Sequence, residues 1–328
     1  MDLTSFPRAN LGTFPTPLQL VSRLGQDFGH RCAYFKRDDL TGLGLGGNKT
    51  RSLEFLLGDA LAKQATVILT AGGLQSNLCS QTAAACAKIG KKCVLVHNDA
   101  PTDELCGNML LNKMFGAEQV FVGQVDEDTR TQKMVGIAER LRAKGETPYV
   151  IHNGASTPMG ALGYANAAIE LYNQSICCEQ RIKHVAIVGA MGGTASGFVF
   201  GTAMLGHPFH VHVISVEYSK PVLRDIMAEL TSGIAELTGL TPPVSCESVM
   251  SITDEYLGDG YAIPTAESEA ALLKAARLEG ILLENVYTSK TLAGLADLVR
   301  VGAVPVDEPV CYIHTGGTAA LFSQQVRF

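Results

Sequence analysis

Short runs of β-branched residues alternate with longer amphipathic segments along nearly the whole chain. The strand-like runs lie at 66–71, 93–98, 119–123, 149–152, 184–189, 209–217 and 309–315. The helical patterns between them lie at 50–64, 77–89, 104–115, 128–144, 159–174, 219–238, 267–280 and 289–300. Because strands that alternate with helices pair in parallel and are covered on both faces, this pattern predicts an α/β fold.

The composition allows a large buried core in one or two domains. The chain has 328 residues, of which 46% are hydrophobic and 18% are charged. Two stretches resemble linkers, the segment 153–158 and the Pro/Gly/Ser-rich segment 239–251. We therefore expect two sheets of about four strands each, in two lobes with a cleft between them.

Several classes of protein do not fit this sequence. A net charge of −6 without a basic stripe argues against a nucleic-acid partner. The opening MDLTSFPRAN has no apolar signal-peptide region, and nine cysteines occur without a C-x-x-C pair, which predicts a cytoplasmic protein. His210 and His212 alternate on one predicted strand, but the sequence offers no third ligand at motif spacing, so we expect no metal site.

One uncharged segment resembles a membrane helix. Between 185 and 206, glycines repeat every fourth residue at Gly189, Gly193, Gly197 and Gly201, a spacing typical of helix pairs in membranes. The segment also carries further glycines, a serine and two threonines, which make it a poor apolar span. A strand, a glycine turn and a buried helix explain it better, so we expect no membrane partner.

The glycine-rich stretch TGLGLGGNKTRSLE (41–54) allows three interpretations. Read as the dinucleotide motif G-x-G-x-x-G, it lacks the acidic residue that should end the next strand, which ends in TAGG. Read as a P-loop, it has Asn48 between the last glycine and the lysine, and no strand ending in a metal-binding aspartate is evident. The third interpretation makes Lys49 itself the reagent.

Lys49 lies at the start of the predicted helix 50–64, whose N-terminus carries a partial positive charge. That field and burial lower the pKa of a lysine, and a neutral amine attacks an aldehyde. A second glycine turn, at 192–194 after the strand 184–189, offers backbone N–H groups to a phosphate. The two features together suggest pyridoxal 5′-phosphate in a Schiff base with Lys49. The alternative is a solvated surface lysine.

Several motifs, in order, resemble the D-cysteine desulfhydrase and 1-aminocyclopropane-1-carboxylate (ACC) deaminase family. They are KRDD (36–39), TGLGLGGNKTRSLEFL (41–56), TAGGLQSN (70–77), the glycine loop 189–194, GILLENVYTSK (280–290) and YIHTGGTAAL (312–321). The resemblance implies a pyridoxal-phosphate enzyme of fold type II, the two-domain tryptophan-synthase-β-like fold, in which each domain is a mostly parallel twisted sheet covered by helices. It also implies a homodimer, with a large domain from 1–50 and 155–328 and a small inserted domain from 51–154.

The resemblance also implies which residues hold the cofactor. Lys49 would form the Schiff base, Asn77 would hydrogen-bond the ring hydroxyl, and Thr288 and Thr315 would lie near the ring. The family's phosphate turn falls on Ala190, Met191, Gly192, Gly193 and Thr194.

Substrate-facing roles fall on a second group of residues. By resemblance, Gln75, Ser76 and Asn77 would face the substrate, and Tyr261 and Tyr287 match two active-site tyrosines. Independently, QSN precedes a predicted helix, so Ser76 can cap that helix and its free N–H groups can bind a carboxylate. A tyrosine has a pKa of about 10, so it is a poor base unless its surroundings lower that value. Without the resemblance, capping and cleft packing would explain these residues.

Two threonines favour the desulfhydrase branch. ACC deaminases carry a glutamate after the second tyrosine and a leucine in the late H-x-G-G stretch, where this chain has Thr288 and Thr315. A threonine near the pyridine nitrogen cannot hold a proton as a carboxylate does, so the ring is a weaker electron sink. That suits β-elimination of a good leaving group. Leu78 and Ser80 replace the family's usual cationic residues after QSN, so we expect less positive charge around the cleft.

The sequence thus predicts a pyridoxal-phosphate-dependent carbon–sulfur lyase. Its expected reaction is α,β-elimination from a small amino acid, with D-cysteine giving pyruvate, hydrogen sulfide and ammonia. Alternative substrates are serine, β-chloroalanine, cysteate and ACC, and the base is Lys49 or a tyrosine. A non-catalytic protein that kept the fold is a further alternative, against which the retained Lys49, Ser76 and tyrosines argue.

Overall fold

The strands form two separate sheets in the computed structural model, which describes residues 1–103, 105–178 and 181–326. The larger sheet has the order β1-β2-β10-β7-β8-β9 and consists of β1 (Leu18–Leu20), β2 (Ala33–Arg37), β7 (His184–Gly189), β8 (His210–Ser215), β9 (Met250–Thr253) and β10 (Val310–His314). The smaller has the order β5-β4-β3-β6 and consists of β3 (Val67–Ala71), β4 (Lys92–His97), β5 (Glu118–Phe121) and β6 (Pro148–Ile151). All pairs are parallel except β1 with β2.

Helices follow the strands in the order that the alternation predicts. The α-helices are α1 (Ser22–Asp27), α2 (Lys49–Ala62), α3 (Asn77–Ile89), α4 (Gly107–Met114), α5 (Glu127–Ala143), α6 (Pro158–Ile176), α7 (Gly193–Met204), α8 (Lys220–Thr238), α9 (Ala266–Glu279), α10 (Thr288–Arg300) and α11 (Thr318–Leu321). Short 3-10 turns are η1 (Asp38–Leu40), η2 (Asn153–Ala155) and η3 (Glu247–Val249). Glu104, the first residue of the predicted helix 104–115, lies outside the described residues.

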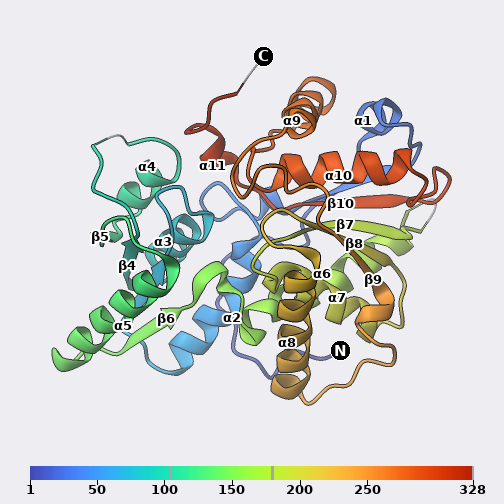
Figure 1. Ribbon diagram of the computed structural model, residues 1–328. Coiled ribbons are helices and arrows are strands. Elements are labelled where there is room, and N and C mark those ends of the chain that lie inside the picture. Colours follow the sequence, from blue (N-terminus) through green and yellow to red (C-terminus); the bar gives the residue numbers. More distant parts are fainter. Residues whose placement is uncertain (104, 179–180, 327–328) are drawn as a thin grey trace.

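Both faces of the larger sheet are covered (Figure 1). On one face, Val185 and Ile187 of β7 pack against side chains of α6, α7 and α8. On the other, Ala186 of β7 and Tyr312 of β10 pack against α1, α9 and α10. Alternate residues of a strand point to opposite faces, so β7 contributes to two cores and its sequence is nearly all apolar.

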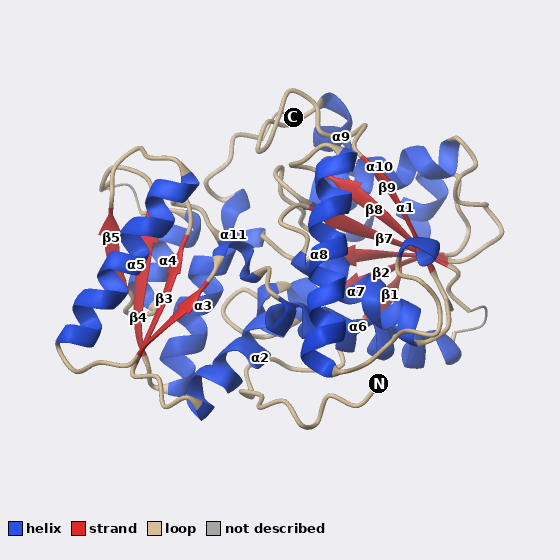
Figure 2. Ribbon diagram, turned by 60° about the horizontal axis from the view of Figure 1, so that its bottom comes forward, coloured by secondary structure: helices blue, strands red, loops and turns tan. Residues whose placement is uncertain are grey.

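The smaller sheet is covered in the same way. Val67 and Leu69 of β3 pack against α5, and Ile68 packs against α2 and α3. The two sheets lie side by side with α2 between them (Figure 2). The predicted α/β fold with two helix-covered, mostly parallel sheets is therefore confirmed.

The predicted strand number is wrong for the larger sheet, which has six strands rather than four. β1 and β9 lie at its edges, where one side of the strand has no partner and an apolar run is not required. β9 begins inside the stretch 239–251 that the sequence suggested as a linker. β2 carries Lys36, whose buried ammonium pairs with Glu170. This charged residue interrupts the apolar pattern from which a buried strand is predicted.

The last two glycines of the four-residue repeat, Gly197 and Gly201, allow close packing between two helices of this fold. A Cβ on Gly197 of α7 would lie 2.0 Å from the carbonyl oxygen of Ala161, and one on Gly201 would lie 2.5 Å from that of Ala165. Both carbonyls belong to α6, so the glycines let the α6 and α7 backbones touch. Among the described residues, no helix is long and apolar enough to span a bilayer.

Candidate active site

A cavity of about 420 Å³ lies where the carboxyl ends of strands from both sheets face each other. In open parallel sheets, loops at this edge carry the ligand-binding side chains. Every predicted site residue lines it except Thr288: Lys49, Gln75, Ser76, Asn77, Ala190, Met191, Gly192, Gly193, Thr194, Tyr261, Tyr287 and Thr315. The structure thus gathers residues that are up to 266 positions apart, counted from Lys49 to Thr315.

Lys49 is the first residue of α2, and its amine enters this cavity. Nζ donates a hydrogen bond to the carbonyl oxygen of Gly154 at 2.6 Å. Burial lowers the pKa of Lys49 to about 8, while the nearby Glu217 carboxylate opposes that shift. An amine that is neutral in a useful fraction at neutral pH can act both as a nucleophile and as a proton acceptor.

The residues before Lys49 are fixed from two sides. The Asn48 side chain donates to Thr194 Oγ1 at 3.0 Å, and its backbone N–H donates to the carbonyl oxygen of Thr315 at 2.9 Å. A Cβ on Gly316 would lie 2.7 Å from the Cα of Gly47, so these two turns pack backbone against backbone. The glycine-rich loop is therefore held by the β7–α7 turn and the β10–α11 turn together.

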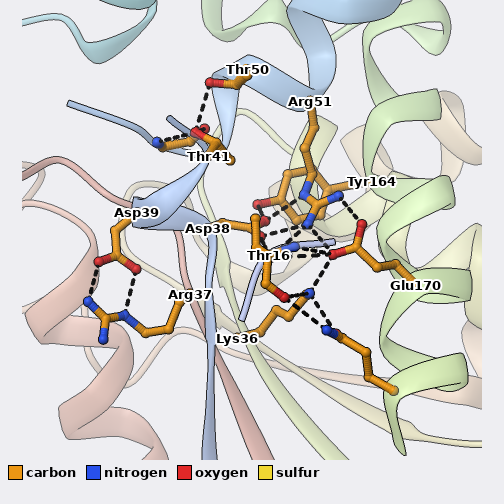
Figure 3. Close-up of polar contacts among 12 residues, drawn as sticks. Thr16, Lys36, Arg37, Asp38, Asp39, Thr41, Thr50, Arg51, Tyr164 and Glu170 are labelled. Carbon is orange, nitrogen blue, oxygen red and sulfur yellow. Dashed lines mark hydrogen bonds and ion pairs between the residues drawn. The ribbon is translucent and has the colours of Figure 1, made fainter. Parts of the chain in front are cut away.

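A buried ion network fastens the first turn of α2 (Figure 3). The Arg51 guanidinium donates to both carboxylate oxygens of Asp38 at 2.8 and 2.7 Å and to Glu170 at 3.0 and 2.9 Å. Tyr164 donates to Asp38 at 2.6 Å, and Lys36 pairs with Glu170. Because Lys49 lies two residues before Arg51, this network sets the position of the reactive amine relative to both α6 and the large sheet.

Ser76 caps α3, as the sequence predicted. Its Oγ accepts from the backbone N–H of Cys79 at 3.3 Å. Asn108 of α4 donates to Asn77 Oδ1 at 2.8 Å, and its backbone N–H donates to Gln75 Oε1 at 2.8 Å. The segment 75–77 is thus held against α4 at the cavity wall, where the N-terminus of α3 favours an anion.

The turn between β7 and α7 forms the opposite wall. Gly192 has φ +82°, a conformation that side chains rarely adopt. A Cβ on Gly193 would lie 2.8 Å from the Cα of Ser156, so glycine is required for close approach there as well. The Gly193 N–H donates to Ser156 Oγ at 3.2 Å, and the first N–H groups of an α-helix have no partner within the helix, so the start of α7 can hold an anion without a cationic side chain.

Tyr261 and Tyr287 share a hydrogen bond between their hydroxyls at the cavity. Desolvation of the hydroxyl raises the pKa of Tyr261 to about 12 and that of Tyr287 well above its usual value. Both phenols are therefore protonated at neutral pH, and they can donate a hydrogen bond or a proton more readily than they can accept one.

Thr288 is the predicted residue that the structure keeps out of the cavity. Its hydroxyl lies 3.1 Å from Glu284 Oε1, and its backbone N–H donates to the same oxygen at 2.8 Å. Glu284 itself lines the cavity, and burial raises its pKa although backbone N–H groups oppose the shift. Sequence reasoning missed this carboxyl group. Its place just before a predicted helix, where acidic residues are favoured, was the available signal.

Four further charged residues that line the cavity escaped the sequence analysis: Asp99, Glu127, Arg130 and Glu217. Glu217 lies two residues after β8 and lines the cavity, and burial raises its pKa to about 7, with Glu127 adding to the shift and Lys49 opposing it. Its place at the end of the predicted strand 209–217 could have drawn attention to it. Arg130 of α5 also lines the cavity and brings a positive charge to it. No local motif marks a helix residue of this kind.

These groups fit pyridoxal phosphate. The buried amine of Lys49 can bind the cofactor's aldehyde, and the glycine turn after β7 can hold its phosphate. Asn77 and Thr315 offer polar atoms to the ring. No group of three or more side chains suited to a metal ion occurs in the described part of the chain.

Comparison with known proteins supports the same assignment. The family model described as "Pyridoxal-phosphate dependent enzyme" matches residues 9–316. D-cysteine desulfhydrases of Yersinia pestis and Salmonella typhi are each 37% identical to this chain, over 98% of it and 97% of the relative. A crystal structure titled as an ACC deaminase homologue has a TM-score of 0.89 at 36% identity, covering 98% of this chain and 95% of that one.

More distant solved structures share the fold. O-ureido-L-serine synthase superposes with a TM-score of 0.69 at 16% identity, over 94% of this chain and 91% of that one. With the family match, the near full-length relatives and the cavity residues in agreement, the chain belongs to the pyridoxal-phosphate dependent enzymes, in the group that contains the D-cysteine desulfhydrases.

Proposed function

We propose that this protein catalyses α,β-elimination from D-cysteine and releases pyruvate, hydrogen sulfide and ammonia. The observation that carries the proposal is the buried Lys49 amine facing the β7–α7 cradle, in a chain similar to D-cysteine desulfhydrases over nearly its full length. The relatives supply the choice of the D-enantiomer, since their printed name specifies it.

The predicted residues that line the cavity have roles in this proposal. Lys49 would hold the cofactor through its aldehyde, the turn from Ala190 to Thr194 would hold the phosphate, and Asn77 and Thr315 would contact the ring. When bound, pyridoxal phosphate supplies an electron sink for the charge that develops at the substrate Cα. Gln75 and Ser76, at the N-terminus of α3, would bind the substrate carboxylate.

The directions of the pKa shifts support Lys49 as the base and the tyrosines as the acid. With a pKa of about 8, Lys49 is the group that takes the Cα proton. Tyr261 and Tyr287, which remain protonated, donate to the sulfur as the carbon–sulfur bond breaks. The departing sulfur carries the bonding electron pair and leaves as hydrogen sulfide.

The remaining expectations belong to the same proposal. The large domain comprises 1–50 and 155–328 and the small domain 51–154, a division that follows the two sheets. We also propose a cytoplasmic homodimer, because the family resemblance implies a dimer and the cysteine pattern fits a reducing compartment. Light scattering on the purified protein tests the dimer, which a mass of one chain would exclude.

ACC deamination is the second candidate, since one similar structure is titled as an ACC deaminase homologue. Thr288 argues against it, because its hydroxyl is engaged with Glu284 and offers no carboxylate at that position.

The proposal is tested by measuring pyruvate release from a panel of D- and L-amino acids and ACC. The purified holoenzyme is compared with Lys49→Ala, which should be inactive. After borohydride reduction, mass spectrometry should locate the cofactor on the peptide that contains Lys49. Preferred release from an L-amino acid or from ACC, or a label on another lysine, would contradict the proposal.

A further inference from the structure

Arg130 is a buried cation whose donors are not used up by the protein. It lies in the first turn of α5, 5% of its surface is exposed, and it lines the active-site cavity. Nη1 donates to Asn98 Oδ1 at 3.0 Å. Among the described residues, Nε and Nη2 have no hydrogen-bond partner.

The surrounding carboxyl groups leave that charge incompletely paired. The nearest is Glu127, whose Oε1 lies 3.9 Å from Arg130 Nη2, beyond hydrogen-bond distance. The Glu127 side chain is 46% exposed and accepts instead from Asn153 Nδ2 at 2.6 Å. Asp99 and Glu217 also line the cavity, and no hydrogen bond joins either to Arg130 among the described residues.

A buried guanidinium with free donors is costly unless something binds there. Unsatisfied buried donors are rare in native proteins, and a planar guanidinium matches an oxyanion that accepts two parallel hydrogen bonds. The turn at 190–194 and the start of α7 offer backbone N–H groups to a phosphate, so the phosphate does not require Arg130. The proposed function already assigns the α-carboxylate to the N-terminus of α3. Arg130 is therefore left for another anion.

We propose that Arg130 is a specificity-determining residue, which binds an oxyanion on the side chain of the substrate. Beside D-cysteine, the enzyme would then accept alanines whose C3 substituent bears a carboxylate or sulfonate, and would prefer them over alanines with a neutral thioether at C3. This inference rests on the proposed function and deepens it. The C3–sulfur bond breaks, its electron pair goes to the sulfur, and one water is consumed in the overall reaction. A carboxylate-bearing thioether gives pyruvate, ammonium and a thiol that carries the carboxylate. A sulfonate gives pyruvate, ammonium and hydrogen sulfite.

Matched substrates isolate the side-chain charge. The holoenzyme is assayed for pyruvate with S-carboxymethyl-D-cysteine and D-cysteate, which are anionic, and with S-methyl-D-cysteine, which is neutral. The readout is the ratio of kcat/KM for each anionic substrate to that of the neutral one. We expect Arg130→Gln to lower the ratios by about 10- to 100-fold, the range of one or two hydrogen bonds to a charged group. Arg130→Lys should restore part of the loss because it keeps the charge but not the planar fork.

Glu127→Gln is the control of opposite sign. It removes the nearest competing carboxylate, so the ratios should rise. Retained cofactor absorbance and an unchanged thermal unfolding midpoint in each variant show that it folds.

Each outcome decides the inference. Ratios that do not change in Arg130→Gln, or an equal fall in kcat/KM for all three substrates as expected of an α-carboxylate ligand, would overturn it while leaving the elimination reaction intact. If S-methyl-D-cysteine and D-cysteine are both inert in the wild type, the proposed function fails. Calorimetry with D-cysteate then decides the Arg130 site separately: weaker binding to Arg130→Gln supports it, and equal binding overturns it.

Discussion

Arg51 is the residue whose loss should most weaken the attachment of the reactive lysine. It is 3% exposed and contacts Asp38, which is fully buried, and Glu170, which is 10% exposed, through hydrogen bonds of 2.7 to 3.0 Å. Arg51→Met fills similar space but leaves two carboxyl groups without their main cation. Removing one partner of a buried ion pair costs about 3–5 kcal/mol, because the remaining charge stays desolvated.

The free energy of unfolding is measured by urea denaturation of the holoenzyme. Lys63→Met, at the C-cap of the same helix, is the matched control, since Lys63 is 64% exposed and its ammonium pairs with Asp59 at 2.8 Å. An exposed pair contributes about 1 kcal/mol or less. We also expect Arg51→Met to release the cofactor more readily, because the first turn of α2 carries Lys49. A loss no larger than that of the control would refute the assigned role of the network.

The acid dependence has a defined sign. Burial alone would raise the pKa of Asp38, but Arg51 outweighs it and the net pKa is lowered. A group with a lowered folded-state pKa stabilises the protein above its unfolded pKa of about 3.9 and loses that contribution as pH falls through the folded value. The wild type should therefore lose stability below about pH 4. In Arg51→Met, the loss of unfolding free energy that protonation of Asp38 causes should be smaller than in the wild type. Urea denaturation midpoints measured at several pH values test this.

Three further outcomes are expected. Glu217→Gln removes the carboxylate that raises the pKa of Lys49. The pKa of the Lys49 amine should therefore fall below about 8. In the cofactor-free protein, the pH dependence of chemical labelling of this amine should move to lower pH. Gly197→Ala places a Cβ 2.0 Å from an α6 carbonyl oxygen and should cost about 1–3 kcal/mol by urea denaturation; an unchanged midpoint would contradict the close packing. Tyr287→Phe removes the hydroxyl that forms a hydrogen bond with the Tyr261 hydroxyl. The kcat for D-cysteine should fall about 100-fold, with little change in KM. An unchanged kcat would exclude the tyrosine pair as the proton donor.

Local pattern predicted most elements and the position of the reactive amine. The strand 184–189 and the helix 77–89 have the bounds that the sequence predicts, and Ser76 caps that helix. These are properties of a few neighbouring residues, because strand and helix periods and caps act over one or two turns of chain. The glycine turn after β7 was identifiable for the same reason. β2 was harder to identify as part of the larger sheet, since Lys36 is charged and its partner Glu170 lies 134 positions away.

The charges that face the cavity depend on distances across the fold. Arg130 on α5, Glu217 after β8 and Glu284 before α10 meet in one cavity only because the two sheets set the carboxyl ends of their strands toward each other. The sequence by itself determined the kinds of elements, their order and the lysine at the start of α2. Only the tertiary structure decided which carboxyl groups and which arginine surround that lysine, because burial and electrostatic coupling depend on spatial separation and not on position along the chain.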